Sequence, residues 1–264
     1  MLRGPITLTT DFGTRDHFVG AMKGVILGIS PRVRIVDITH EIAPQQVSEA
    51  AFAISQAWRY FPKGTIHVVV VDPGVGSARR PILCETEGQF FIAPDNGVLS
   101  MIYDSAPHKV RILSNEKLFL KKVSKTFHGR DVFAPAAANL SRGLAPAKFG
   151  KPIHDAVRSI LLKPTPLSNN HWSGVVLHAD RFGNLITNFH IAEFPALLKH
   201  PMELRAGSQR ITRLAATYAD TAIGELFAII GSSEYVEVVV NQGSAAKMLG
   251  LGTGSSVELE IFYE

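Results

Sequence analysis

The stretch IHVVVVDPGVG, residues 66–76, decides how the first half of the chain folds. An almost continuous apolar run is followed at once by an Asp-Pro-Gly turn. Such runs are typical of strands in a parallel sheet, where helices cover both faces of each strand. Residues 66–71 are therefore predicted to form a buried strand, with Asp72 at its carboxyl end.

Strand and helix patterns alternate around this run. Within residues 16–30, for example, apolar side chains recur with the period of a helix. Strands separated by helices of this length indicate β-α-β crossovers and a mainly parallel sheet. The predicted strands are 5–10, 33–39, 66–71, 82–86, 90–94 and 110–114, and the predicted helices are 16–30, 47–61, 97–103 and 133–143.

The pattern changes after residue 155. Residues 156–171 contain two prolines, several polar residues and no sustained period, which indicates a linker. Short strand-like runs separated by glycine and polar turns follow, and they are typical of a small β-barrel or sandwich. The chain is thus predicted to be an α/β protein, with an N-terminal α/β domain at 1–155 and a smaller, barrel-like all-β domain at 172–264.

Composition excludes several classes of protein. The chain has 264 residues, of which 46% are hydrophobic and 19% charged, so a folded core is expected rather than disorder. The 27 basic and 23 acidic residues are mostly scattered, and no nucleic-acid surface is expected. The single cysteine, Cys84, cannot form an internal disulfide and suits a reducing compartment. No signal peptide or membrane span is recognisable, so we expect a cytoplasmic protein with no membrane partner.

Two aspartates follow predicted strands. Asp72 ends the run at 66–71, and Asp11 ends the strand at 5–10 in the motif TTDFGTRD. The carboxyl ends of parallel strands share one edge of the sheet, where open α/β sheets bind ligands. For Asp11 the alternative is simple turn chemistry, because Asp and Gly are common in tight turns.

Arginine and histidine side chains could join these carboxylates. The motif VDPGVGSARR places Arg79 and Arg80 shortly after Asp72, and either could form a plain ion pair with it. His128, in TFHGRD, lies in a Gly-flanked loop, a common place for site residues. Asp, Arg and His together can hold and deprotonate a water molecule. A metal site is a weaker alternative, because no H-x-x-x-H or C-x-x-C spacing occurs; we predict no metal and no other cofactor.

The C-terminal half offers a second group of candidates in HADRFGNLITNF. Phe182 lies in a polar turn, where an exposed ring suggests that something stacks on it. Asn184 can donate and accept hydrogen bonds, as a purine edge requires. Ordinary β-turn chemistry is the alternative for both residues. A later strand and its flanks, GSSEYVEVVVNQ, add Ser232, Ser233, Tyr235 and Glu237 at the start, and Asn241 and Gln242 at the end.

Five motifs, in this order, carry a resemblance: TTDFGTRDHFVGAMKG, VDPGVGSARR, FIAPDNGVLS, TFHGRDVFAP and DRFGNLITN. From about residue 5 to its end, the chain resembles the S-adenosyl-L-methionine hydroxide adenosyltransferases, relatives of the halide-using fluorinase and chlorinase. The resemblance implies an α/β domain followed by a β-barrel-like domain. It also implies homotrimers, with active sites between the N-terminal domain of one chain and the C-terminal domain of its neighbour.

The resemblance also implies roles for individual residues. Asp72, Arg79 and His128 match the catalytic set of the family, and Arg79 is favoured over Arg80 because that arginine lies seven residues after the aspartate. Asp11 matches the carboxylate that holds the ribose hydroxyls. The predicted substrate-binding set is completed by Phe182, Asn184 and Val240 for adenine, by Asp180 and Ser232 for the methionine part, and by Tyr235 and Glu237.

The implied activity is hydrolysis of S-adenosyl-L-methionine to adenosine and L-methionine, by attack of water on C5′ in line with the sulfur. Asp72 stands where the fluorinase has a tyrosine, and the carboxylate of Asp72 would repel a halide. Gly129 stands where the fluorinase has a serine. Ser233 replaces an arginine of the fluorinase, which leaves the contacts of the methionine carboxylate open. Three alternatives remain: halide-dependent cleavage, a non-catalytic nucleoside- or S-adenosyl-L-methionine-binding protein, and a metal-dependent phosphohydrolase.

Overall fold

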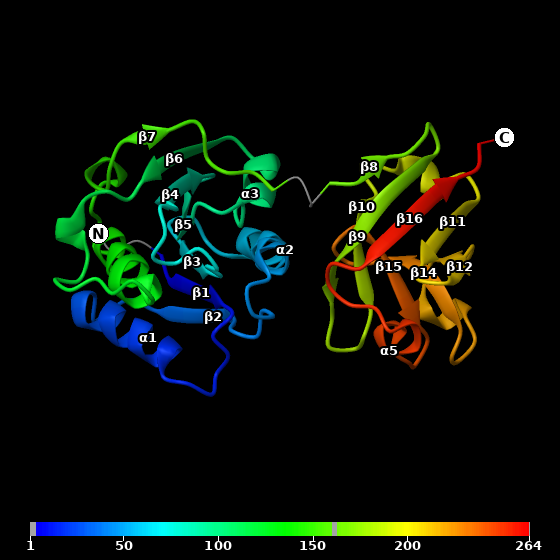
Figure 1. The fold of residues 1–264 in the computed structure, drawn as a ribbon, viewed down its shortest axis with the longest axis horizontal. Helices are drawn as coiled ribbons and strands as arrows, with labels where there is room; N and C mark the ends of the chain where they lie inside the picture. Colours follow the sequence, from blue (N-terminus) through cyan, green and yellow to red (C-terminus); the bar gives the residue numbers. More distant parts are fainter. Residues whose placement is uncertain (1–3, 160–162, 264) are drawn as a thin grey trace. The chain divides into compact units, whose positions relative to one another are not determined.

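The computed structural model describes residues 4–159 and 163–263, which fall into two compact units, 1–159 and 160–264 (Figure 1). The predicted linker, 156–171, includes residues 160–162, which lie outside the described residues. Within it, Thr165–Pro166 forms a short strand, β8, that pairs with the first long strand of the second unit.

The N-terminal unit alternates strands and helices much as its sequence predicts. The predicted helix at 47–61 ends earlier, because its last turn tightens into a 3₁₀ turn at Trp58–Tyr60. The strands are β1 Ile6–Thr10, β2 Ile35–Thr39, β3 Ile66–Val70, β4 Pro81–Thr86, β5 Gln89–Pro94, β6 His108–Ile112 and β7 Pro152–Ile153. The helices are α1 Phe18–Ile29, α2 Val47–Ala57, α3 Ser100–Ser105 and α4 Ala134–Ser141, with a π turn at Gly129–Phe133 and 3₁₀ turns at Glu116–Leu118 and Pro146–Lys148.

Within the described residues, these strands form one seven-stranded sheet in the order β2-β1-β3-β5-β4-β6-β7. Strand β1 is parallel to β2 and β3, and β3 is parallel to β5. Strand β4 is antiparallel to both β5 and β6, so β6 runs in the direction of β5. The predicted mainly parallel sheet is thereby confirmed.

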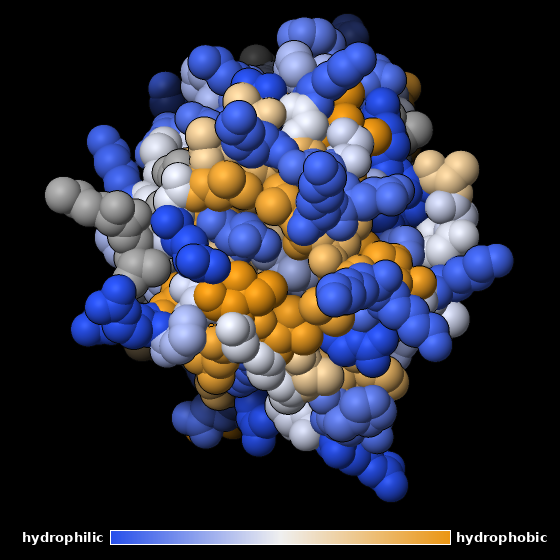
Figure 2. Space-filling model, turned by 90° about the vertical axis from the view of Figure 1, so that its left-hand side faces the viewer, coloured by the Kyte–Doolittle hydropathy of each residue, from blue (hydrophilic) through white to orange (hydrophobic). Residues whose placement is uncertain are grey.

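The surface of the molecule mixes charged and apolar side chains. On the face shown in Figure 2, apolar residues gather in the middle and hydrophilic residues surround them. Leu27 on α1 and Val123 in a loop are among the large apolar side chains that the N-terminal unit leaves exposed.

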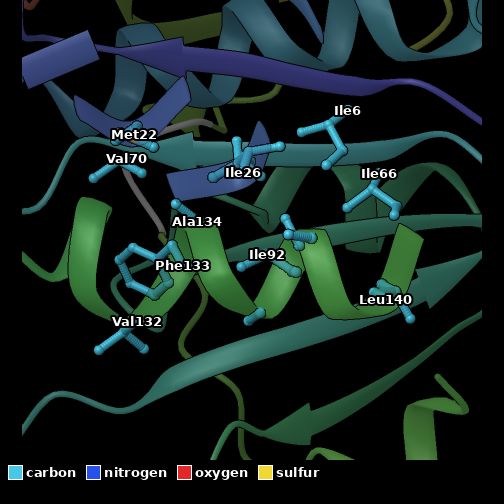
Figure 3. Packing of buried hydrophobic residues seen from close by; sticks show 14 of the residues in the cluster. Ile6, Met22, Ile26, Ile66, Val70, Ile92, Val132, Phe133, Ala134 and Leu140 are labelled. Carbon is cyan, nitrogen blue, oxygen red and sulfur yellow. The ribbon is translucent and has the colours of Figure 1, made fainter. Parts of the chain in front are cut away.

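The core of this unit lies on both sides of the central strand β3, every residue of which is buried. Val68 and Val70 pack with α1 and α4 in one cluster, and Figure 3 shows Phe133 in the same cluster. Val69 and Val71 belong to a second cluster with α2 and α3. Because burying one such side chain contributes roughly 1.5–3 kcal/mol, this two-sided burial holds the carboxyl end of β3 firmly in place.

The C-terminal unit is mostly strand, with a short helix, α5, that its sequence did not predict. Its long strands agree with the short strand-like runs that its sequence predicts. The elements are β8, β9 His171–Ala179, β10 Leu185–His190, β11 Met202–Ala206, β12 Gln209–Ile211, β13 Leu214–Ala215, β14 Leu226–Ile230, β15 Tyr235–Val240, α5 Ala245–Leu249 and β16 Ser256–Ile261, with 3₁₀ turns at Pro195–Leu198 and Tyr218–Asp220.

These strands form a curled sheet in the order β12-β11-β16-β9-β10-β15-β14-β13, and β8 pairs with β9. All of its pairings are antiparallel except that between β13 and β14. Its inward-facing side chains, including Leu185, Phe189, Val238 and Leu259, form one apolar core. The curl agrees with the barrel-like domain that we predicted.

Candidate active site

A cavity of about 390 Å³ lies at the carboxyl edge of the N-terminal sheet. Thr10 of β1 pairs with Val70 of β3, so these two strands end at the same level. Asp11 and Asp72 follow the two strands, and both line this cavity together with His128. The prediction that the two carboxylates share one sheet edge is confirmed.

Arg79 connects Asp72 to His128. Its Nε donates to Asp72 Oδ1 at 2.9 Å, and its Nη2 donates to Oδ2 of the same carboxylate. Nη2 also lies 3.0 Å from Nδ1 of His128. The Asp72 and Arg79 side chains are only 6% and 8% exposed, so water screens this pair weakly.

The contact with Arg79 decides which nitrogen of His128 carries the proton. A guanidinium can only donate, so Nδ1 of His128 must accept and the proton lies on Nε2. Burial and the positive charge of Arg79 lower the pKa of His128, and they outweigh the opposing effect of nearby carboxylates. His128 is therefore neutral near pH 7 and offers an Nε2–H donor.

The neighbouring Arg80 belongs to a different network. It donates to Asp95 at 2.6 Å and to Asp155 at 2.9 Å. The residues alone left open which arginine would meet Asp72, whereas the family resemblance favoured Arg79, and the structure brings Arg79 to it.

The loop that carries His128 is held from two sides. Gly76 has φ +78°, and a Cβ at this position would lie 2.3 Å from the carbonyl oxygen of Lys125, so only glycine allows the turn after Asp72 to approach so closely. Asp131, fully buried in the π turn, accepts a hydrogen bond from the Ser124 amide at 2.8 Å. Together these contacts fix the segment that precedes the π turn.

Asp11 does not serve as the cap of its own turn. Its Oδ2 accepts a hydrogen bond from the amide of Gln45 at 2.9 Å, thirty-four residues away. Oδ1 receives no hydrogen bond from the described residues and remains available to a ligand. The simple turn interpretation of Asp11 therefore accounts for its position but not for its contacts.

A second cavity, of about 950 Å³, lies in the C-terminal unit. Tyr235 is not among its lining residues, because its ring packs against His190 at 4.7 Å between centroids. The lining includes six members of the predicted substrate-binding set: Asp180, Phe182, Asn184, Ser232, Glu237 and Val240.

The turn at 180–184 organises one wall of this cavity. Asp180 Oδ1 accepts from the amides of Phe182 and Asn184, both at 2.9 Å. Asp180 Oδ2 accepts from Nδ2 of Asn184, also at 2.9 Å, which orients the side-chain amide. The Phe182 ring remains 77% exposed, so a flat ligand can stack on it.

We expect Gly183→Ala to destabilise the protein more than Gly224→Ala does. Both glycines have positive φ, +86° and +80°, so both substitutions strain the backbone. A Cβ at Gly183 would also lie 1.9 Å from Oγ of Ser244, which caps α5, whereas a Cβ at Gly224 meets nothing within 4 Å. Thermal unfolding of the two variants measures the difference, and equal melting temperatures would contradict this role of Gly183.

Glu237 should make stability depend on pH. Burial, together with the charge of Asp180, raises the pKa of Glu237 from 4.5 to about 7. The folded protein therefore keeps the proton that the unfolded chain releases, and the stability linked to Glu237 is lost as pH rises from 4.5 to about 7. We expect Glu237→Gln to melt like wild type below pH 4.5 and at a higher temperature than wild type above pH 7. Identical melting curves across this range would show that the carboxyl is not perturbed.

Several lining residues gave no signal in the sequence. Tyr218 and Lys247 lie in the second cavity, on a 3₁₀ turn and on α5, in segments without a clear periodic pattern. In the first cavity, Phe12 and Phe18 line the wall with Phe127, at centroid distances of 5.1–5.8 Å. For Phe12, the only indication of a site in the sequence is its position between Asp11 and a glycine.

No cluster of three or more His, Cys, Asp or Glu side chains suited to a metal ion occurs among residues 4–159 and 163–263.

Comparisons with known proteins place the chain in a family. Residues 6–150 match the model of the SAM hydroxide adenosyltransferase N-terminal domain, and residues 174–258 match that of its C-terminal domain. The chain is 37% identical to the (R)-S-adenosyl-L-methionine hydrolase of Salinispora tropica, over 96% of this chain and 97% of that protein. It is 35% identical to the enzyme of the same name from Thermus thermophilus, over 97% of this chain and 99% of that protein. A fluorinase from Actinoplanes is 29% identical over 96% of each chain.

A solved structure of an uncharacterized conserved protein from Thermotoga maritima superimposes with a TM-score of 0.87. It is 36% identical and covers 96% of this chain and 99% of its own. Both domain models match in order and together span most of the sequence. The chain therefore belongs to the SAM hydroxide adenosyltransferase family.

Proposed function

We propose that the protein hydrolyses S-adenosyl-L-methionine to adenosine and L-methionine. The observation that carries this proposal is that Asp72 and His128, which Arg79 joins, line one cavity with Asp11 at the carboxyl edge of the sheet. Relatives that are 32–37% identical are named (R)-S-adenosyl-L-methionine hydrolase.

In the proposed reaction, the oxygen of water attacks C5′ while the C5′–sulfur bond breaks on the opposite side. The electron pair of that bond neutralises the sulfonium, so methionine leaves as a thioether and needs no general acid. The water proton passes to Asp72 and then to solvent. A positioned base of this kind contributes on the order of 10²–10⁴ in rate.

The residues around Asp72 orient its carboxylate and bind the water and the ribose. Arg79 holds both oxygens of Asp72, which aims the carboxylate. The Nε2–H of His128 can donate to the attacking water. The free Oδ1 of Asp11 accepts one ribose hydroxyl, and Oδ2, which keeps its contact with the amide of Gln45, accepts the other.

The second cavity would bind the two ends of the substrate. We propose that Phe182 stacks on adenine, while Asn184 and the backbone at Val240 contact its edge. Asp180, Ser232 and Glu237 are proposed to receive the ammonium group of the methionine part. Tyr235 supports this wall only through its packing on His190.

The assay is incubation with S-adenosyl-L-methionine in H₂¹⁸O, followed by chromatography and mass spectrometry. We expect adenosine that carries ¹⁸O at its 5′-hydroxyl, together with unlabelled methionine, and we expect the activity to survive EDTA. Formation of 5′-chloro-5′-deoxyadenosine with chloride would support the halide alternative. Binding without turnover would support a non-catalytic protein, and loss of activity with EDTA would support a metal enzyme.

We further propose a cytoplasmic homotrimer in which a neighbouring chain completes each site. The family resemblance and the exposed apolar surface in Figure 2 support this proposal. Among the helices of the described residues, none has the length and apolar character of a membrane span.

Mixing two inactive variants tests the shared site. Asp72→Asn damages the first cavity and Asn184→Ala the second, so random reassembly should create some sites with neither lesion and recover part of the activity. No recovery after verified subunit exchange, or a fully active monomer on a sizing column, would contradict a shared site.

A further inference from the structure

A buried histidine outside the cavity lining touches both ends of the turn that carries Asp11. His40 directly follows β2 and is only 4% exposed. Its Nδ1 lies 2.9 Å from Oγ1 of Thr10, a fully buried residue. Its carbonyl oxygen accepts a hydrogen bond from the amide of Gly13 at 2.7 Å. Asp11 thus lies between two contacts to one residue, which directly follows the neighbouring strand.

The far side of the imidazole is also fixed. Nε2 of His40 lies 3.1 Å from Oδ1 of Asp37, off the line of a well-directed hydrogen bond, and Lys23 Nζ lies 2.6 Å from Oδ2. Burial acts to raise the pKa of Asp37, but the contacts with Lys23 and His40 outweigh it and lower the pKa. A carboxylate can only accept, so it favours the proton on Nε2 and leaves Nδ1 to accept from the hydroxyl of Thr10.

The hydroxyl of Thr10 has a second contact inside the turn. It accepts a hydrogen bond from the amide of Phe12 at 3.2 Å. The Thr10 hydroxyl therefore links the residue before Asp11 to the residue after it. The amide of Gln45 holds Asp11 itself through Oδ2. The segment from His40 to Gln45 thus contacts the turn at three points.

We propose that His40 is a positioning residue, which fixes the carboxylate of Asp11 for the ribose hydroxyls by tying Thr10 on one side and Gly13 on the other. This inference rests on the proposed function, because it requires Asp11 to bind a ribose. A carboxylate that receives two hydroxyls has to be held within about 0.5 Å of its working position, which a free turn would not do.

The test compares Thr10→Val, Thr10→Ser and Thr9→Val by calorimetry in the full-length protein. Valine keeps the shape of threonine and removes the hydroxyl that meets His40, whereas serine keeps it. Thr9 is the matched control, since it is equally buried on the same strand and its hydroxyl has no hydrogen-bond partner among the described residues. We expect Thr10→Val to weaken adenosine binding about tenfold, the equivalent of one net hydrogen bond, and the other two variants to bind like wild type.

A second ligand separates positioning from general damage. 2′,3′-Dideoxyadenosine lacks the hydroxyls that Asp11 would hold, so Thr10→Val should leave its affinity unchanged. His40→Leu should show the same selective loss for adenosine, and combining it with Thr10→Val should add little, because both remove one contact. An equal loss for both ligands, or no loss for either, would overturn the proposal.

Failure of the proposed function would look different. In that case wild type itself would not bind adenosine. The hold of His40 on the turn can then still be measured by amide hydrogen exchange. Exchange should be faster at Gly13 and Gln45 in Thr10→Val than in Thr9→Val. Unchanged exchange at both amides would show that His40 does not hold the turn.

Discussion

Asp72→Asn is expected to lower kcat by about 10²–10⁴-fold, while the affinity for adenosine stays close to that of wild type. The asparagine keeps the shape of the side chain and can still accept a hydrogen bond from Arg79, so the fold around the buried guanidinium should survive. It cannot take a proton from water, however. The measurements are steady-state turnover of S-adenosyl-L-methionine and calorimetric binding of adenosine.

Asp95→Asn is the matched control for this experiment. Asp95 is a buried partner of Arg80, the next arginine in the chain, and does not line the first cavity. Its substitution should reduce stability and leave kcat nearly unchanged. If Asp72→Asn turned over substrate at the wild-type rate, or if both variants lost activity alike, Asp72 would not be the base.

Asp11→Ala is expected to weaken adenosine binding strongly. A hydrogen bond to a charged acceptor contributes roughly 1.5–3 kcal/mol, and two ribose hydroxyls would lose such a bond. The loss should be absent for 2′,3′-dideoxyadenosine, because that ligand has no hydroxyl to offer. Calorimetry with both nucleosides measures the effect.

Asp16→Ala controls for the removal of a carboxylate from the same motif. Asp16 is exposed and does not line the cavity, so its loss should not change adenosine affinity. Unchanged binding in Asp11→Ala would mean that the Asp11 carboxylate serves only its contact with the amide of Gln45.

Much of the fold could be predicted because burial imposes simple periods on the sequence. Strand β3 is covered on both faces, so its apolar run is continuous, and α1 shows the helical period of a surface helix. Short elements escaped prediction because they contain too few residues to show a period. Strand β13 has two residues and α5 has five, and tertiary contacts rather than local sequence form them.

The candidate site was only partly predictable for a related reason. Strand ends and glycine-flanked loops pointed to Asp11, Asp72 and His128, since topology alone brings such positions to one edge. The choice between Arg79 and Arg80 depends on how one turn bends, and no spacing rule in the sequence itself encodes that. Tyr235 lies opposite His190 in the β10–β15 pairing and packs on it, which strand periodicity did not reveal.

The π turn at Gly129–Phe133 affects how the segment after His128 tolerates a change in length. A π turn holds one residue more than the α turn it replaces, so a single inserted residue in an α-helix produces it. Because the wider turn absorbs the extra residue, His128 before it and α4 after it keep the register of a regular helix. The segment between His128 and α4 would thus tolerate a change of one residue in length, while the contact between His128 and Arg79 stays in place.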